Sequence, residues 1–176
     1  LLRDGYAYVG VSAQKGGVDA LRARSRYQSL HHPGDEFSYD LFSQAGAAVR
    51  GTLGLDLLDG LEPQRVLAAG ESQSAGRMVT YINAIHRHAR LASGTPVYDG
   101  YLVKGYTRPY RIRRCAPALE AGDPRIVIRN VGVPVIHLQM EGDFPNVLET
   151  RREDSDTRDD PFRLYRVTDV FLTPES

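Results

Sequence analysis

Two serines, separated by one residue, lie where an apolar run gives way to a helical pattern, in the stretch RVLAAGESQSAGRMVTYINAIH (65–86). A tight turn from a strand into a helix can expose a serine hydroxyl as a nucleophile. The residues two before and two after that serine must then be small, because the backbone passes close to itself. Gly70 and Ser74 flank Ser72 in this way. The spacing therefore makes Ser72 a candidate nucleophile for acyl transfer.

Two other interpretations of this stretch remain open. The spacing also fits Ser74, which has small residues on both sides. We favour Ser72 because the apolar strand is expected to end at Ala69 or Gly70, and because a longer strand would place the Glu71 carboxylate in a buried layer. The other interpretation is a serine that only caps a helix after a buried strand. The strand before the serine and the amphipathic helix after it favour the nucleophile.

The start of the expected helix adds a second chemical element. Free backbone N–H groups and the helix dipole stabilise negative charge at a helix N-terminus. The N–H of Gln73, the residue after the candidate nucleophile, is therefore our candidate oxyanion donor. Loss of one such donor costs about 2.7–4 kcal/mol of transition-state stabilisation.

A pair of carboxylates follows a later apolar run, VPVIHLQM (133–140), in the sequence Glu141-Gly142-Asp143. The chain order of a serine–acid–histidine triad on an α/β sheet places the acid in the loop after such a strand. The acid orients the histidine and stabilises its imidazolium form. Asp143 is our first candidate for this acid and Glu141 the second. A polar turn without a catalytic role is the alternative.

Five histidines could supply the third member of a triad, and each has a simpler interpretation. His137 lies inside an expected buried strand and is predicted to be a hydrogen-bonded core residue. His86 and His88 lie near the end of the helix, roughly 20 Å from its start, where a solvated cation suits the helix dipole. His31 and His32 follow the first expected strand, and of the five they alone are expected near the rim of a site.

The order of elements predicts an α/β fold with a mostly parallel sheet and flanking helices, because strand–helix–strand crossovers force parallel strands. We expect one domain, with a loop over 13–37 and a solvated charge run over 151–160. The strand at 65–70 shows no polar alternation, which is typical of a strand buried on both faces. The expected strands are 6–12, 65–70, 98–103, 133–140 and 162–171, and the expected helices are 38–50, capped by Ser38, and 73–89.

Composition excludes several classes of partner. The 176 residues include 22 basic and 22 acidic side chains, so no nucleic acid is expected as a partner. No apolar run is long enough for a membrane span. One cysteine excludes an internal disulfide, and no histidine or carboxylate cluster has metal-ligand spacing, so we expect no metal and no cofactor. Compartment and oligomeric state stay open.

Several stretches together resemble one family, usually described as alpha/beta hydrolase domain-containing proteins. They are DGYAYVGVSAQ, SLHHPGDEFSYDLFSQAG, RVLAAGESQSAGRMVTYINAIH, YDGYLV and VPVIHLQMEGD. The resemblance implies a serine hydrolase with Ser72 as nucleophile, Asp143 or Glu141 as acid and a small-molecule carboxylic ester as substrate.

The sequence departs from the pattern of that family at two places. The resemblance implies further strands and an oxyanion loop before residues 6–12, and a catalytic histidine after the last strand, and neither has a counterpart here. We therefore expect residues 1–176 to form a single partial α/β-hydrolase domain with little or no activity by itself. The alternative is a non-catalytic binding or assembly domain that retains the fold without a complete triad.

Overall fold

The computed structural model describes residues 2–105, 109, 111–112, 117–143 and 148–167. Contacts within the chain separate it into two compact units, Leu1–Gln64 and Arg65–Ser176, which we call unit 1 and unit 2 and describe separately. The expectation of one domain stays a prediction.

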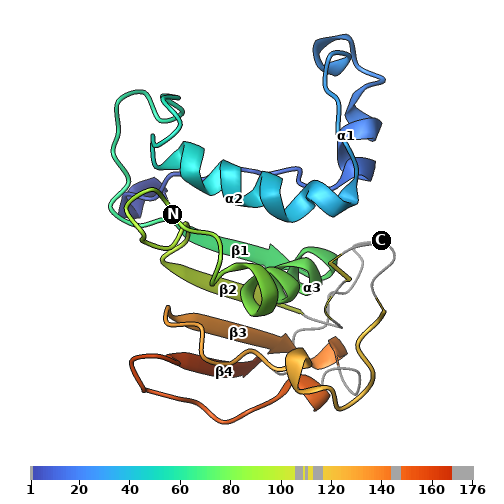
Figure 1. The fold of residues 1–176 in the computed structure, drawn as a ribbon, viewed down its shortest axis with the longest axis vertical. Helices are drawn as coiled ribbons and strands as arrows, with labels where there is room; N and C mark the ends of the chain where they lie inside the picture. The colour runs from blue at the N-terminus through green and yellow to red at the C-terminus, as the bar shows by residue number, and fades with distance from the viewer. Residues whose placement is uncertain (1, 106–108, 110, 113–116, 144–147, 168–176) are drawn as a thin grey trace. The chain divides into compact units, whose positions relative to one another are not determined.

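Unit 1 contains helix α1 (Lys15–Leu21) and helix α2 (Ser38–Val49), with 3-10 helices at Leu2–Asp4, Ser25–Tyr27 and Asp35–Phe37 (Figure 1). A buried histidine fixes the turn before α2. His32 Nε2 is 2.9 Å from the carbonyl oxygen of Ala13, and His32 Nδ1 accepts a 3.1 Å hydrogen bond from the N–H of Gly34. Both ring nitrogens are therefore engaged inside unit 1.

Three expectations for unit 1 were wrong in whole or in part. Residues 6–12 form no strand, since the described part of unit 1 offers no neighbouring strand to pair with them. Helix α1 lies in the segment expected to be a loop, where two consecutive glycines conceal the helical pattern. The predicted helix over 38–50 is confirmed, but Ser38 is its first residue and Phe37 holds the cap position.

Unit 2 is built on a four-stranded parallel sheet in the order β1 (Leu67–Glu71), β2 (Gly100–Lys104), β3 (Val135–Met140) and β4 (Phe162–Val167). Figure 1 shows the four strands side by side, with α3 (Gln73–Thr80) beside β1 and β2. This confirms the predicted α/β class with a parallel sheet. Residues 168–171 of the last expected strand lie outside the described residues.

The two faces of the sheet differ in burial. One face is buried and carries Ala68, Tyr101, Val103, Val135, His137, Gln139 and Phe162. The opposite face is exposed, with Leu67 59% and Tyr165 51% accessible. The prediction that the first strand is buried on both faces was therefore wrong, because α3 packs on one face alone.

Helix α3 is shorter than the expected helix over 73–89. It passes into a π-helical turn at Tyr81–Ile85, in which the N–H of His86 donates to the carbonyl of Tyr81 over 2.8 Å. A π turn adds a residue to the turn and changes which side chains face the core. Tyr81, Ile82 and His86 are buried.

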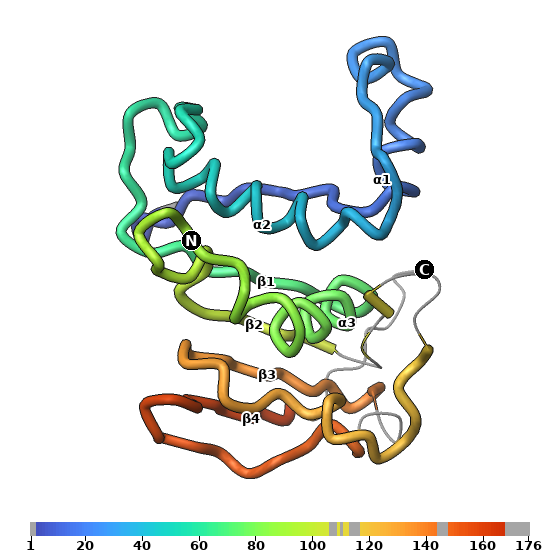
Figure 2. Tube along the Cα trace, in the orientation of Figure 1, coloured from blue at the N-terminus to red at the C-terminus, as the bar shows by residue number. Residues whose placement is uncertain are grey.

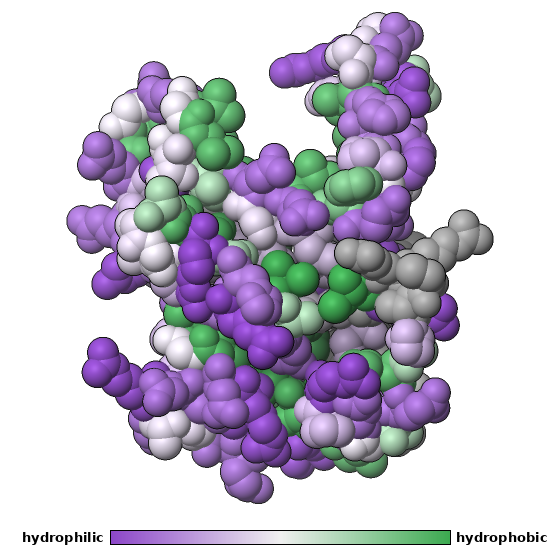
Figure 3. Space-filling view, in the orientation of Figure 1, coloured by the Kyte–Doolittle hydropathy of each residue, from purple (hydrophilic) through white to green (hydrophobic). Residues whose placement is uncertain are grey.

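The loop before β4 is only partly the solvated charge run that we expected. Its surface is largely hydrophilic (Figure 3). The side chain of Arg152, however, is 5% exposed, pairs with Asp160 at 2.5 Å and lies 4.0 Å over the ring of Phe162. The buried ion pair therefore joins the two ends of the loop, and Arg152 packs the loop on Phe162 of β4. Short 3-10 helices at Pro124–Ile126, Glu141–Asp143 and Leu148–Thr150 complete the described elements of unit 2.

Candidate active site at the carboxyl edge of the sheet

Ser72 joins β1 to α3 with an unusual backbone conformation. Its φ is 53° and its ψ is −118°. Residues other than glycine rarely adopt a positive φ, and holding one there costs on the order of 1–3 kcal/mol. Figure 2 traces the chain from the strand through this point into the helix. The surrounding structure must therefore hold Ser72 in place.

Backbone hydrogen bonds on both sides supply that restraint. The N–H of Ser72 donates to the carbonyl of Lys104 at the end of β2 over 3.0 Å, and its own carbonyl accepts the N–H of Gly76 over 3.1 Å. The side chain is exposed and forms no capping hydrogen bond, although Ser72 holds the N-cap position of α3. The hydroxyl is therefore not used as a simple helix cap.

At Gly70 the backbone of β1 passes close to the start of α3, as the small residue permits. A Cβ atom placed on Gly70 would lie 2.9 Å from the Cε atom of Met78 and 2.9 Å from the carbonyl oxygen of Ser74. Real Cβ atoms essentially never approach other atoms so closely. Any larger residue would push the start of α3 away from the strand. Ser74, the alternative candidate, is the second residue of that helix.

One of our reasons for preferring Ser72 was wrong. Strand β1 runs to Glu71, beyond the expected end at Ala69 or Gly70. The carboxylate of Glu71 is not buried, because this residue lies on the exposed side of an edge strand and pairs with Lys104 Nζ at 2.9 Å. The positive φ at Ser72, rather than the burial of Glu71, distinguishes the two serines.

Asp143 is held at the end of β3 by the backbone. Its Oδ2 accepts the N–H of Met140 over 2.8 Å, and the side chain is partly buried. Glu141, in the same 3-10 turn, is exposed. This hydrogen bond fixes the position of the Asp143 carboxylate.

Gly105 brings Asp143 and Ser72 together. It follows β2 with a φ of 57°, and its N–H donates to the carbonyl of Leu138 on β3 over 3.0 Å. A Cβ on Gly105 would lie 3.6 Å from both carboxylate oxygens of Asp143 and 4.0 Å from the backbone nitrogen of Ser72. The two sequence-predicted residues thus lie around one glycine. Sequence reasoning missed Gly105, although a glycine just after the expected strand at 98–103 was a signal.

A comparison with protein-family models identifies the family of the chain. The model, described as alpha/beta hydrolase domain, matches residues 1–170. The chain belongs to the alpha/beta hydrolase domain family. Searches of curated proteins and of solved structures each gave no significant match.

In this alpha/beta hydrolase domain, Gln73 is the first residue of α3. The first N–H groups of a helix have no acceptor within the helix, and the dipole there favours negative charge. The backbone N–H of Gln73 is adjacent to the exposed side chain of Ser72. An oxyanion that forms at this serine would therefore have a donor next to it.

Unit 2 contains three histidines, and their surroundings differ. His86 is 3% exposed and its Nδ1 lies 2.7 Å from the hydroxyl of Tyr101, so the prediction of a solvated His86 was wrong. His137 is 1% exposed and packs against Phe162, which confirms it as a core residue. His88 is exposed as expected and accepts a hydrogen bond from Arg87.

Burial changes the titration of two of these histidines. It lowers the pKa of His137 to about 4. It also lowers the pKa of His86 to about 4, with a further contribution from the charge of Arg90 and a partial offset by the backbone of Val131. Burial raises the pKa of the Tyr101 hydroxyl well above its usual range, so Tyr101 stays neutral beside His86. The imidazole rings of His86 and His137 are therefore neutral near pH 7.

Within the ranges that the structure describes, no three histidine, cysteine or acidic side chains are grouped as a metal site. No helix in those ranges is long and apolar enough to cross a bilayer.

Proposed function

We propose that the chain is a serine hydrolase domain in which Ser72 attacks a carboxylic ester. The observation that carries the proposal is the strained turn at Ser72, which exposes a hydroxyl that does not cap its helix. Strain of this kind persists where the surroundings fix it, and it is concentrated at functional sites. A strand, a sharp turn at serine and a helix are also the elements of a nucleophile elbow.

The proposed chemistry follows from the positions of three groups. The Ser72 Oγ adds to the ester carbonyl and gives its proton to a base, while the N–H of Gln73 donates to the oxyanion. Collapse of the intermediate expels the alcohol, which takes up that proton, and leaves an acyl group on Ser72. Water then releases the acid. Asp143 is proposed to orient the imidazole base, and its fixed, partly buried carboxylate favours it over Glu141.

The proposal assigns none of the histidines as the general base. His86, His137 and His32 are each buried and held by other contacts. Removal of a triad member leaves residual catalysis from the oxyanion donor and substrate binding. We therefore propose that the 176-residue chain has low esterase activity, and that added imidazole can supply the base.

Ester hydrolysis in imidazole buffer tests the proposal. The rate with p-nitrophenyl acetate, after subtraction of the protein-free reaction, is expected to saturate with substrate and to fall about 100-fold or more in Ser72→Ala. Ser74→Ala, the matched control two residues away, is expected to retain most of it. Equal rates in Ser72→Ala and the unsubstituted chain would exclude Ser72. Fast hydrolysis without imidazole, lost in Ser72→Ala, would show that the chain contains its own base.

A second candidate function is a non-catalytic binding or assembly domain. The contacts that hold the histidines of unit 2 favour it. It predicts no saturable, protein-dependent hydrolysis in imidazole and no covalent capture of an electrophile at Ser72. The same measurements therefore separate the two functions.

A further inference from the structure

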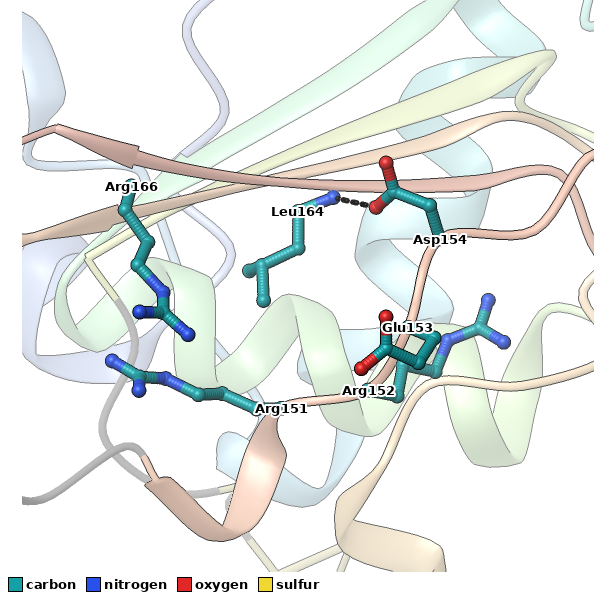
Figure 4. Close-up of a pocket in the computed structure, with 6 residues that line it drawn as sticks. All are labelled: Arg151, Arg152, Glu153, Asp154, Leu164 and Arg166. Atoms are coloured by element: carbon teal, nitrogen blue, oxygen red, sulfur yellow. Dashed lines mark hydrogen bonds between the residues drawn. The ribbon is translucent and has the colours of Figure 1, made fainter.

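A polar hollow lies beside β4, with a volume of about 410 Å³. Figure 4 shows its six lining residues, three of them arginines: Arg151, Arg152, Glu153, Asp154, Leu164 and Arg166. Arg166 is paired in register with Gln139 of β3, near the carboxyl edge of the sheet. Three strand spacings of about 4.8 Å separate β4 from β1, so the hollow is roughly 14 Å across the sheet from the strand that precedes Ser72.

One arginine of the hollow is fixed by the core. Arg151 Nε donates to Gln139 Oε1 over 2.9 Å. Gln139 is fully buried, and its Nε2 donates to the hydroxyl of Thr150 over 3.3 Å. The position of the Arg151 guanidinium is therefore set by a buried side chain and costs little further ordering when a ligand binds.

The second arginine of interest faces the first. Figure 4 shows the guanidinium groups of Arg151 and Arg166 directed toward one another. Burial, and then the positive charge of Arg166, lower the pKa of Arg151. Two cations held close together repel each other, and an anion between them would remove this repulsion.

The other charges of the hollow are largely committed elsewhere. Arg152 pairs with Asp160 at 2.5 Å. Asp154 accepts the N–H of Leu164 over 2.8 Å and lies 3.8 Å from Arg163. Glu153 is exposed, and Figure 4 places its carboxylate apart from the facing pair of guanidinium groups. The carboxylates that line the hollow therefore lie apart from the facing guanidinium groups of Arg151 and Arg166.

We propose that Arg151 and Arg166 form a binding subsite for an oxyanion group, a carboxylate or a phosphate. The planar guanidinium group matches both chemistries through paired hydrogen bonds. The subsite does not require Ser72 to be a nucleophile. If it serves the proposed hydrolase, it selects ligands with an anionic group at a distance from the ester.

Binding of inorganic phosphate and of succinate to the unsubstituted chain tests the subsite at low ionic strength. Arginine Nε–H signals in proton–nitrogen NMR spectra report the binding site. Saturable shifts of the Arg151 and Arg166 signals are expected with at least one of the two probes. A response to phosphate alone indicates a phosphate group as ligand, and a response to succinate alone indicates a carboxylate.

Two variants make the test specific. Arg166→Gln removes an exposed side chain and is expected to weaken binding about tenfold, the loss of one charged hydrogen-bond pair. Arg158→Gln removes the same charge from an exposed arginine outside the hollow and is expected to leave binding unchanged. No saturable response to either probe, or equal weakening in both variants, would overturn the proposal.

Discussion

Asp143 and Gly105 lie so close that a methyl group on the glycine would be 3.6 Å from both carboxylate oxygens. The same methyl group would be 4.0 Å from the backbone nitrogen of Ser72. The ends of β1, β2 and β3 therefore converge on one residue without a side chain. In parallel α/β sheets, functional groups gather at the carboxyl ends of the strands, and this convergence has that form.

Gly105→Ala is expected to damage the candidate site as well as stability. Its φ of 57° costs an L-residue about 1–2 kcal/mol, and relief of this strain would shift the turn that contacts Asp143 and Ser72. The imidazole-supported hydrolysis rate is expected to fall about tenfold or more, because small misplacements of reacting groups are costly. Gly142→Ala is the control for stability, since its Cβ meets nothing within 4 Å. Unchanged stability of Gly105→Ala would contradict the positive φ at this residue.

Gly70→Ala tests the close passage beneath the turn. The new Cβ would lie 2.9 Å from Ser74 O, a backbone atom that cannot move without shifting α3. Overpacking of this kind costs about 1–3 kcal/mol of unfolding free energy. Urea unfolding of Gly70→Ala and Gly142→Ala measures the difference. Equal stability of the two variants would show that the backbone passage at Gly70 is more open than described.

Arg152→Ala is expected to lower the free energy of unfolding by about 3–5 kcal/mol, because it leaves the Asp160 carboxylate without its buried partner. Arg163→Ala removes an arginine that is 38% exposed and is expected to lower the free energy of unfolding much less, because exposed ion pairs contribute little. Chemical unfolding of both variants tests the contrast. A small effect of Arg152→Ala would mean that the loop before β4 does not depend on this ion pair.

Acid is expected to destabilise unit 2 through its buried histidines. His86 and His137 have pKa values of about 4 in the folded chain, below the ordinary 6.5. Above pH 6.5 both states are neutral and stability is complete. As the pH falls from about 6.5 to about 4, these histidines become protonated in the unfolded chain but stay neutral in the folded chain. The free energy of unfolding therefore decreases by up to about 3 kcal/mol for each histidine.

Denaturant unfolding between pH 7.5 and pH 4.5 measures this loss. His137→Gln is expected to reduce the pH dependence, and His88→Gln, at an exposed site, is expected to leave it unchanged. Unfolding free energies that do not change over this range would contradict the neutral, buried state of the two rings.

The sheet and the turn at Ser72 were predictable from local patterns, since four short apolar runs and a serine between the first run and a helical pattern carry the signal. The role of Gly105 was not, because it depends on which strands are neighbours and in what register. The burial of His86 was missed because the residue was assigned to the solvated end of the helix, although its spacing of four from Ile82 and seven from Val79 places it on the apolar face. The burial of Arg152 depends on a partner in the same polar run, which composition alone describes as solvated.

Covalent capture with a fluorophosphonate, mapped to a residue by peptide mass spectrometry, tests the central claim most directly. We expect one adduct, at Ser72, in the unsubstituted chain with imidazole present. The adduct is expected to persist in Ser74→Ala and to disappear in Ser72→Ala. An adduct that persists in Ser72→Ala and disappears in Ser74→Ala would contradict the account.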